Sequence, residues 1–61
     1  MAVKDLAETM ATSETWISVW YDDEEHEVYF QYGYVDVSMT IEDFRDFVET
    51  LVKAEEKLGK K

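Results

Sequence analysis

The 61-residue sequence contains no cysteine and no proline, and it has only two glycines. Without cysteine, the chain can form neither a disulfide nor a thiolate-ligated metal site. No repeat, low-complexity tract or linker-like segment interrupts it, so we expect residues 1–61 to form one small domain. A chain of this length buries only about 60% of its unfolded surface. Because disulfides are excluded, association with another chain is the common stabilising device that remains.

Long hydrophobic runs are also missing. No apolar stretch approaches the ~18 residues that a membrane-spanning helix needs. Residues 1–8 include acidic side chains and lack an uninterrupted apolar core, unlike a secretory signal peptide. We therefore expect no membrane insertion and a cytoplasmic location.

Basic residues are scarce in most of the chain. The net charge is −9, and between Asp5 and Glu49 there are thirteen acids and a single base, Arg45. Direct binding to nucleic acid is disfavoured, because such binding depends on Lys and Arg neutralising phosphates. Two interpretations of the negative charge remain open: it keeps the chain soluble, or it attracts a basic protein partner.

The middle of the chain has the composition of β-strands. Residues 15–21, 27–32 and 34–39 are rich in β-branched and aromatic residues or alternate between apolar and polar positions. A short polar turn at 22–26 indicates an antiparallel hairpin. Gly33 marks either a tight turn before the third strand or a bulge in one long strand. These segments predict a three-stranded antiparallel meander.

Two helices are predicted at the ends of this sheet. Residues 41–58 follow a suitable N-cap, Thr40, and precede a suitable C-terminal stop, Gly59. An apolar stripe of helical period runs along this segment: Ile41, Phe44, Phe47, Val48, Leu51, Val52 and Leu58. Residues 3–11 also have helical apolar spacing and predict a short N-terminal helix. The predicted fold class is α+β, with the C-terminal helix packed on one face of the sheet.

Aromatic residues are concentrated in the predicted strands, where seven of the nine fall between Trp16 and Tyr34. Because strand side chains alternate between faces, Trp16, Trp20 and Tyr29 lie on the face that the C-terminal helix does not cover. That face needs cover from the N-terminal helix, a second subunit or a partner. We take Trp16, Trp20, Tyr29 and Tyr34 as candidate partner-binding residues; the alternative is that the N-terminal helix simply buries the tryptophans.

No motif for catalysis or cofactor binding is present. The polar turn and its flanks contain a cluster of acids around the single histidine, His26: Asp22, Asp23, Glu24, Glu25 and Glu27. This cluster lacks the spacing and the glycine of a calcium loop, so we interpret it as a hydrated acidic surface. No nucleophile elbow or glycine-rich phosphate loop occurs. We expect no enzymatic activity, no cofactor and no metal.

The sequence favours a small acidic protein–protein interaction module or regulatory subunit that self-associates as a homodimer. Self-association would use the tryptophan face or strand 15–21 as a sheet edge, and it predicts that Trp20→Ala weakens the dimer. The alternative is a nucleic-acid mimic that inhibits a basic DNA- or RNA-binding protein through the acidic cluster, Asp36, Asp43 and Asp46.

Overall fold

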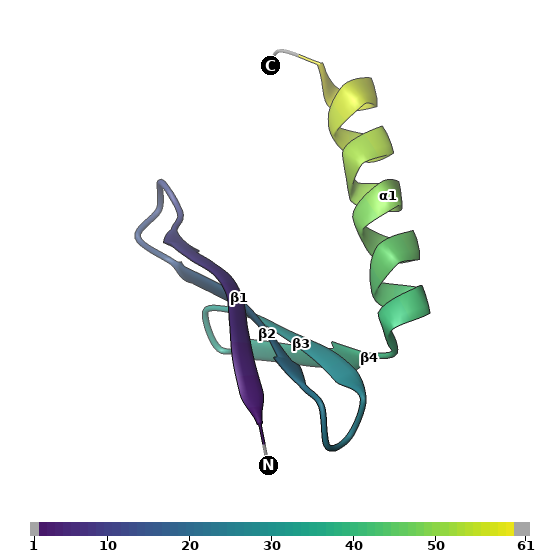
Figure 1. Cartoon of the computed structure of the whole chain (residues 1–61). Coiled ribbons are helices and arrows are strands. Elements are labelled where there is room, and N and C mark those ends of the chain that lie inside the picture. The colour runs from purple at the N-terminus through teal and green to yellow at the C-terminus, as the bar shows by residue number, and fades with distance from the viewer. Residues whose placement is uncertain (1, 60–61) are drawn as a thin grey trace.

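The computed structural model of the chain describes residues 2–59 and shows one four-stranded antiparallel sheet followed by a helix (Figure 1). The elements are β1 Val3–Met10, β2 Trp16–Asp22, β3 Glu27–Tyr32, β4 Val35–Met39 and α1 Ile41–Leu58. Neighbours in the sheet are neighbours in sequence, so the sheet is a simple meander in the order β1-β2-β3-β4. The predicted α+β class is confirmed. Lys60 and Lys61 lie outside the described residues.

The three predicted strands are present as β2, β3 and β4, with ends within one residue of the predicted ranges. Strands β2 and β3 form the predicted hairpin around the acidic turn, and Val19 pairs with Phe30 near its middle. Gly33 and Tyr34 form the tight turn between β3 and β4. Gly33 adopts a φ of 60°, a conformation that glycine reaches without steric cost.

The prediction of a helix over residues 3–11 is wrong, because Val3–Met10 form β1, the antiparallel neighbour of β2. The register shifts between Asp5 and Ala7, which leaves Leu6 as the extra residue of a bulge. A bulge interrupts strict alternation, and apolar residues three and four apart then imitate helical spacing within a strand. A helix of this length is marginal without packing, whereas pairing with β2 satisfies the backbone of β1.

Strand β1 has two consequences for the earlier expectations. It lies beside β2 in the plane of the sheet (Figure 1), so it does not cover the tryptophan face. It also makes β2 an interior strand, paired on both sides, so residues 15–21 are not the sheet edge that we expected. The edges are β1 and β4.

Helix α1 has the predicted ends. The hydroxyl oxygen of Thr40 accepts a hydrogen bond from the backbone N–H of Asp43 at 3.2 Å. The N–H of Gly59, at a φ of 65°, donates to the carbonyl of Glu55 at 3.1 Å. Acidic residues occupy the first turn and Lys57 the last, which suits the helix dipole.

Helix α1 rises away from the sheet and packs on it only near its own N-terminal half (Figure 1). The main contact is a stack between Phe30 of β3 and Phe47, with ring centroids 5.3 Å apart. Val28, 4% exposed, is the one buried apolar side chain of the described residues. The predicted packing of the helix on one face is therefore present over part of its length, and the described chain has almost no closed core.

Candidate interaction surfaces

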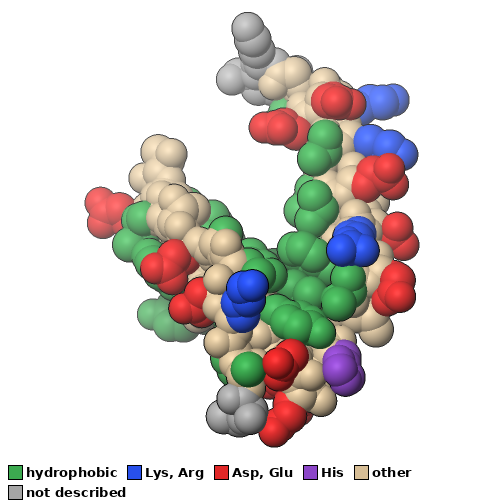
Figure 2. Space-filling view, viewed as in Figure 1, with side chains coloured by type: hydrophobic (Ala, Val, Ile, Leu, Met, Phe, Trp, Pro, Cys, Tyr) green, Lys and Arg blue, Asp and Glu red, His purple; other side chains and the backbone are tan. Residues whose placement is uncertain are grey.

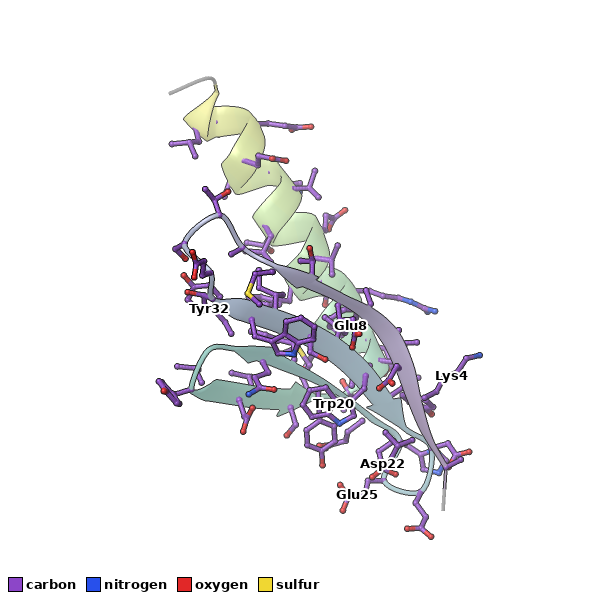
Figure 3. The ribbon with its side chains drawn as sticks, turned by 90° about the vertical axis from the view of Figure 1, so that its left-hand side faces the viewer. Lys4, Glu8, Trp20, Asp22, Glu25 and Tyr32 are labelled. Carbon is purple, nitrogen blue, oxygen red and sulfur yellow. The ribbon has the colours of Figure 1, made fainter. Side chains whose placement is uncertain are left out.

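The sheet face turned away from α1, here called the outer face, carries the predicted aromatic residues. The strand register places Asp5, Trp20, Tyr29 and Ser38 opposite one another in a row that crosses all four strands. Figure 3, in which α1 lies behind the sheet, shows Trp20 projecting toward the viewer. The rings of Trp20 and Tyr29 are parallel within 3°, with centroids 5.6 Å apart. Both side chains are half-buried, since each ring shields one side of the other.

A hydrogen bond holds the hydroxyl end of the Tyr29 ring. The Tyr29 hydroxyl donates to the Glu25 carboxylate at 2.5 Å. This bond raises the pKa of Tyr29 to about 12, with smaller contributions from desolvation and from the negative charges of Glu25, Glu27 and Asp22. The acidic turn and the aromatic pair are thus one connected surface.

The acidic turn itself is folded rather than extended. The Asp22 carboxylate accepts hydrogen bonds from the backbone N–H groups of Glu24 and Glu25, at 2.9 and 3.3 Å. His26 adopts a φ of 59°, in the left-handed region. Asp23, Glu24, Glu25 and His26 are exposed, so the turn presents its charges to solvent from a defined backbone.

Further acids surround the aromatic pair. By strand alternation and register, the outer face carries Asp5, Glu8, Asp22, Glu27 and Asp36. Asp5 and Glu8 were not among the predicted acidic surface residues, because the segment that holds them was interpreted as a helix. Alternation of residues 3, 5, 8 and 10 around a one-residue bulge is the signal that would have placed them.

Trp16 and Tyr34 lie at the opposite end of the sheet from the acidic turn. They line a shallow cleft of about 380 Å³ together with Glu14, Thr15 and Gly33. Trp16 is 40% exposed, and Tyr34, at the tip of the β3–β4 turn, is fully exposed. Of the four predicted partner-binding residues, the fold therefore stacks Trp20 on Tyr29 and brings Trp16 near Tyr34, with Ser18 between the two tryptophans along β2.

A second surface, here called the groove, lies between the other sheet face and α1. Its volume is about 370 Å³, and its lining is apolar or aromatic: Ile17, Val19, Phe30 and Tyr32 from the sheet, and Phe44, Phe47, Val48 and Leu51 from the helix. Figure 2 shows hydrophobic side chains on the inner sides of helix and sheet, facing the hollow between them. The sequence pattern predicts that the helix packs on this face of the sheet, and it does not predict the groove between them.

Within residues 2–59, no three His, Cys, Asp or Glu side chains converge as metal ligands. In the same part of the chain, the helix is too polar to cross a bilayer.

Comparison of the chain with protein-family models, with curated proteins and with solved structures finds no match. The function must therefore be inferred from the two surfaces.

Proposed function

We propose that the protein is a small acidic protein–protein interaction module or regulatory subunit, self-associating and without catalytic activity of its own. Its outer face binds a basic segment of a protein partner. The observation that supports this proposal is the Trp20–Tyr29 stack at the centre of an acidic sheet face that no other described element covers.

The chemistry of the outer face suits a lysine- or arginine-rich partner. Indole and phenol rings attract cations through their π-faces, and the surrounding carboxylates provide acceptors for guanidinium or ammonium groups. Tryptophan and tyrosine are also the side chains most enriched among interface hot spots. Asp5 and Glu27 flank the aromatic pair on different strands, so a basic segment lying across the sheet could contact both rings and acids.

The proposal is tested by titrating the ¹⁵N-labelled protein with an arginine- and lysine-rich peptide and with a glutamate-rich peptide of equal length. The basic peptide should shift the indole N–H signal of Trp20 and the backbone signals of Tyr29, whereas the acidic peptide should not. Trp20→Ala should raise the dissociation constant of the basic peptide by roughly 30-fold, as expected for a hot-spot residue. Val48→Ala, a truncation in the groove, is the matched control and should leave the affinity unchanged.

An unchanged affinity in Trp20→Ala, or shifts confined to the groove, would contradict the assignment of this face. If Trp20→Ala does weaken the peptide complex, a pull-down from the native host that compares wild type with Trp20→Ala at low and high salt would identify the partner.

The alternative function is a nucleic-acid mimic that inhibits a basic DNA- or RNA-binding protein. The folded acidic turn favours it, because Asp22 holds the backbone of Glu24 and Glu25 in place and so limits the positions of their charges. Both complexes join opposite charges, so added salt should weaken both. A mimic should tolerate Trp20→Ala, whereas binding through the Trp20–Tyr29 stack should be weakened by this substitution.

A further inference from the structure

We propose that the groove is the homodimer interface, and that it is occupied by helix α1 of a second copy of this chain. This inference makes the self-association of the proposed function specific. It places the interface on the face opposite the Trp20–Tyr29 stack, not on the tryptophan face that the sequence suggested.

The first argument is area. The chain has 5202 Å² of accessible surface at a mass of 7.2 kDa, whereas a compact monomer of that mass exposes about 4,100 Å². The excess is about 1,100 Å². An obligate dimer buries about 1,000 Å² or more per subunit, so the excess matches what one subunit contributes to such an interface. The radius of gyration, 12.9 Å, also exceeds the roughly 10.5 Å of a compact chain of this length.

The second argument is the location of the exposed apolar surface on α1. Val48 and Leu51 line the groove and are 40% and 51% exposed. Leu58 lies two turns beyond Leu51 on the same side of the helix, and it is 57% exposed. The helix spans about 27 Å, and its ring stack on the sheet is at Phe47, in its N-terminal half. Within residues 2–59, the apolar stripe of its C-terminal half stays exposed.

The third argument is complementarity between copies. One wall of the groove is an apolar sheet surface around Ile17 and Phe30, and the other is the apolar stripe of a helix. In a twofold arrangement, the helix of each copy would lie on the sheet wall of the other, so that one kind of contact occurs twice. No other partner is needed to supply a helix of the right polarity.

The fourth argument is charge. Each copy carries a net charge of −9, so two copies associate most readily through the surface with the least charge. The residues that line the groove include no Asp, Glu, Lys or Arg. The outer face carries Asp5, Glu8 and Asp36 among its acids, and apposing two such faces would place like charges together.

Sedimentation equilibrium tests the proposal. The wild type should have twice the chain mass of 7.2 kDa, and its melting temperature should rise with concentration. Leu51→Glu should raise the dimer dissociation constant at least tenfold. Lys53→Gln makes the same change of one unit in net charge on the opposite side of α1 and should stay dimeric, as should Trp20→Ala on the outer face. A folded wild-type monomer, or a dimer that Trp20→Ala dissociates and Leu51→Glu does not, would overturn the proposal.

A second measurement covers the case in which Leu51→Glu fails to fold. In a mixed sample of ¹³C-labelled and unlabelled wild type, isotope-filtered spectra should show intermolecular contacts from the Leu51 and Leu58 methyl groups to Ile17 or Phe30. Intermolecular contacts at Trp20 in their place would assign the interface to the outer face and refute the proposal. The peptide titration reports on the outer face, and sedimentation reports on the groove. Either the proposed peptide binding or the proposed dimer interface can therefore fail without the other.

Discussion

Tyr29 and Phe30 are adjacent in β3, yet their rings stack on opposite sides of the sheet: Tyr29 on Trp20 of β2, and Phe30 on Phe47 of α1. The first stack belongs to the acidic outer face and the second to the groove. Strand alternation at this one dipeptide therefore separates a charged aromatic surface from an apolar one. A substitution that affects one surface can leave the other intact, which makes their roles experimentally separable.

The Trp20–Tyr29 stack should contribute to stability beyond the area that it buries. A double-mutant cycle of Trp20→Ala and Tyr29→Ala should show a coupling free energy of about 0.5–1.5 kcal/mol, typical of an aromatic pair. Urea unfolding at one fixed protein concentration measures it. The same cycle with Trp16 in place of Trp20 is the control and should be nearly additive. Equal coupling in both cycles would show that the ring stack is not the source.

Stability should fall at alkaline pH because of Tyr29. Its folded pKa of about 12 exceeds the pKa of about 10 of an unfolded tyrosine, so the folded state binds the phenolic proton more tightly. The resulting stabilisation is fully present below pH 10 and is lost as the pH rises from about 10 to 12. Unfolding of wild type and Tyr29→Phe across this range should show a steeper decline in wild type.

Glu25→Gln supplies the matching test of the cause of this shift. It removes the negative charge of the group that accepts the hydrogen bond from the Tyr29 hydroxyl. The midpoint of the ultraviolet titration of Tyr29 should therefore move to a lower pH. A titration midpoint equal to that of the wild type would refute the Glu25 hydrogen bond as the main cause of the raised pKa of Tyr29.

The N-cap at Thr40 should be worth about 1 kcal/mol. Thr40→Ala removes the oxygen that accepts from the Asp43 N–H, and such changes cost about 0.5–2 kcal/mol. Thr40→Ser keeps the oxygen and should restore most of the stability. Urea unfolding followed by circular dichroism measures both variants. Equal losses in Ala and Ser would indicate that the methyl group, and not the cap, matters at this position.

Gly33→Ala should destabilise the protein by about 1 kcal/mol or more, since the backbone there has a φ of 60°. The added Cβ would also lie 3.2 Å from Cγ2 of Thr15. Gly59→Ala has a similar φ but meets open space at a helix end that can fray, so its cost should be smaller. Thermal unfolding compares the two, and a larger loss at Gly59 would contradict this account.

Several parts of the fold could be predicted from local patterns. Helix α1 was found from the cap at Thr40, the stop at Gly59 and the apolar period between them, because capping depends on residues close in sequence. Strands β2 to β4 followed from alternation. Strand β1 was missed, since the bulge at Leu6 produced helical spacing, and only pairing with β2 identifies that segment as a strand.

The candidate sites divide in the same way. The shared face of Trp20 and Tyr29 could be predicted from alternation within each strand. The ring stack, the Tyr29–Glu25 hydrogen bond and the addition of Asp5 and Glu8 to the outer face depend on how separate strands align. Register of this kind is set by contacts between segments, and local composition does not specify it.

By itself, the amino-acid sequence determined the α+β class, the bounds of the C-terminal helix, the polarity of the faces of β2 to β4 and the acidity of the chain, since these follow from periodicity, capping and composition. Only the tertiary structure decided that the helix stands away from the sheet and leaves the groove open. Periodicity shows which side of an element is apolar. It does not show whether that side packs against its own chain, because the angle between helix and sheet depends on contacts between residues distant in sequence.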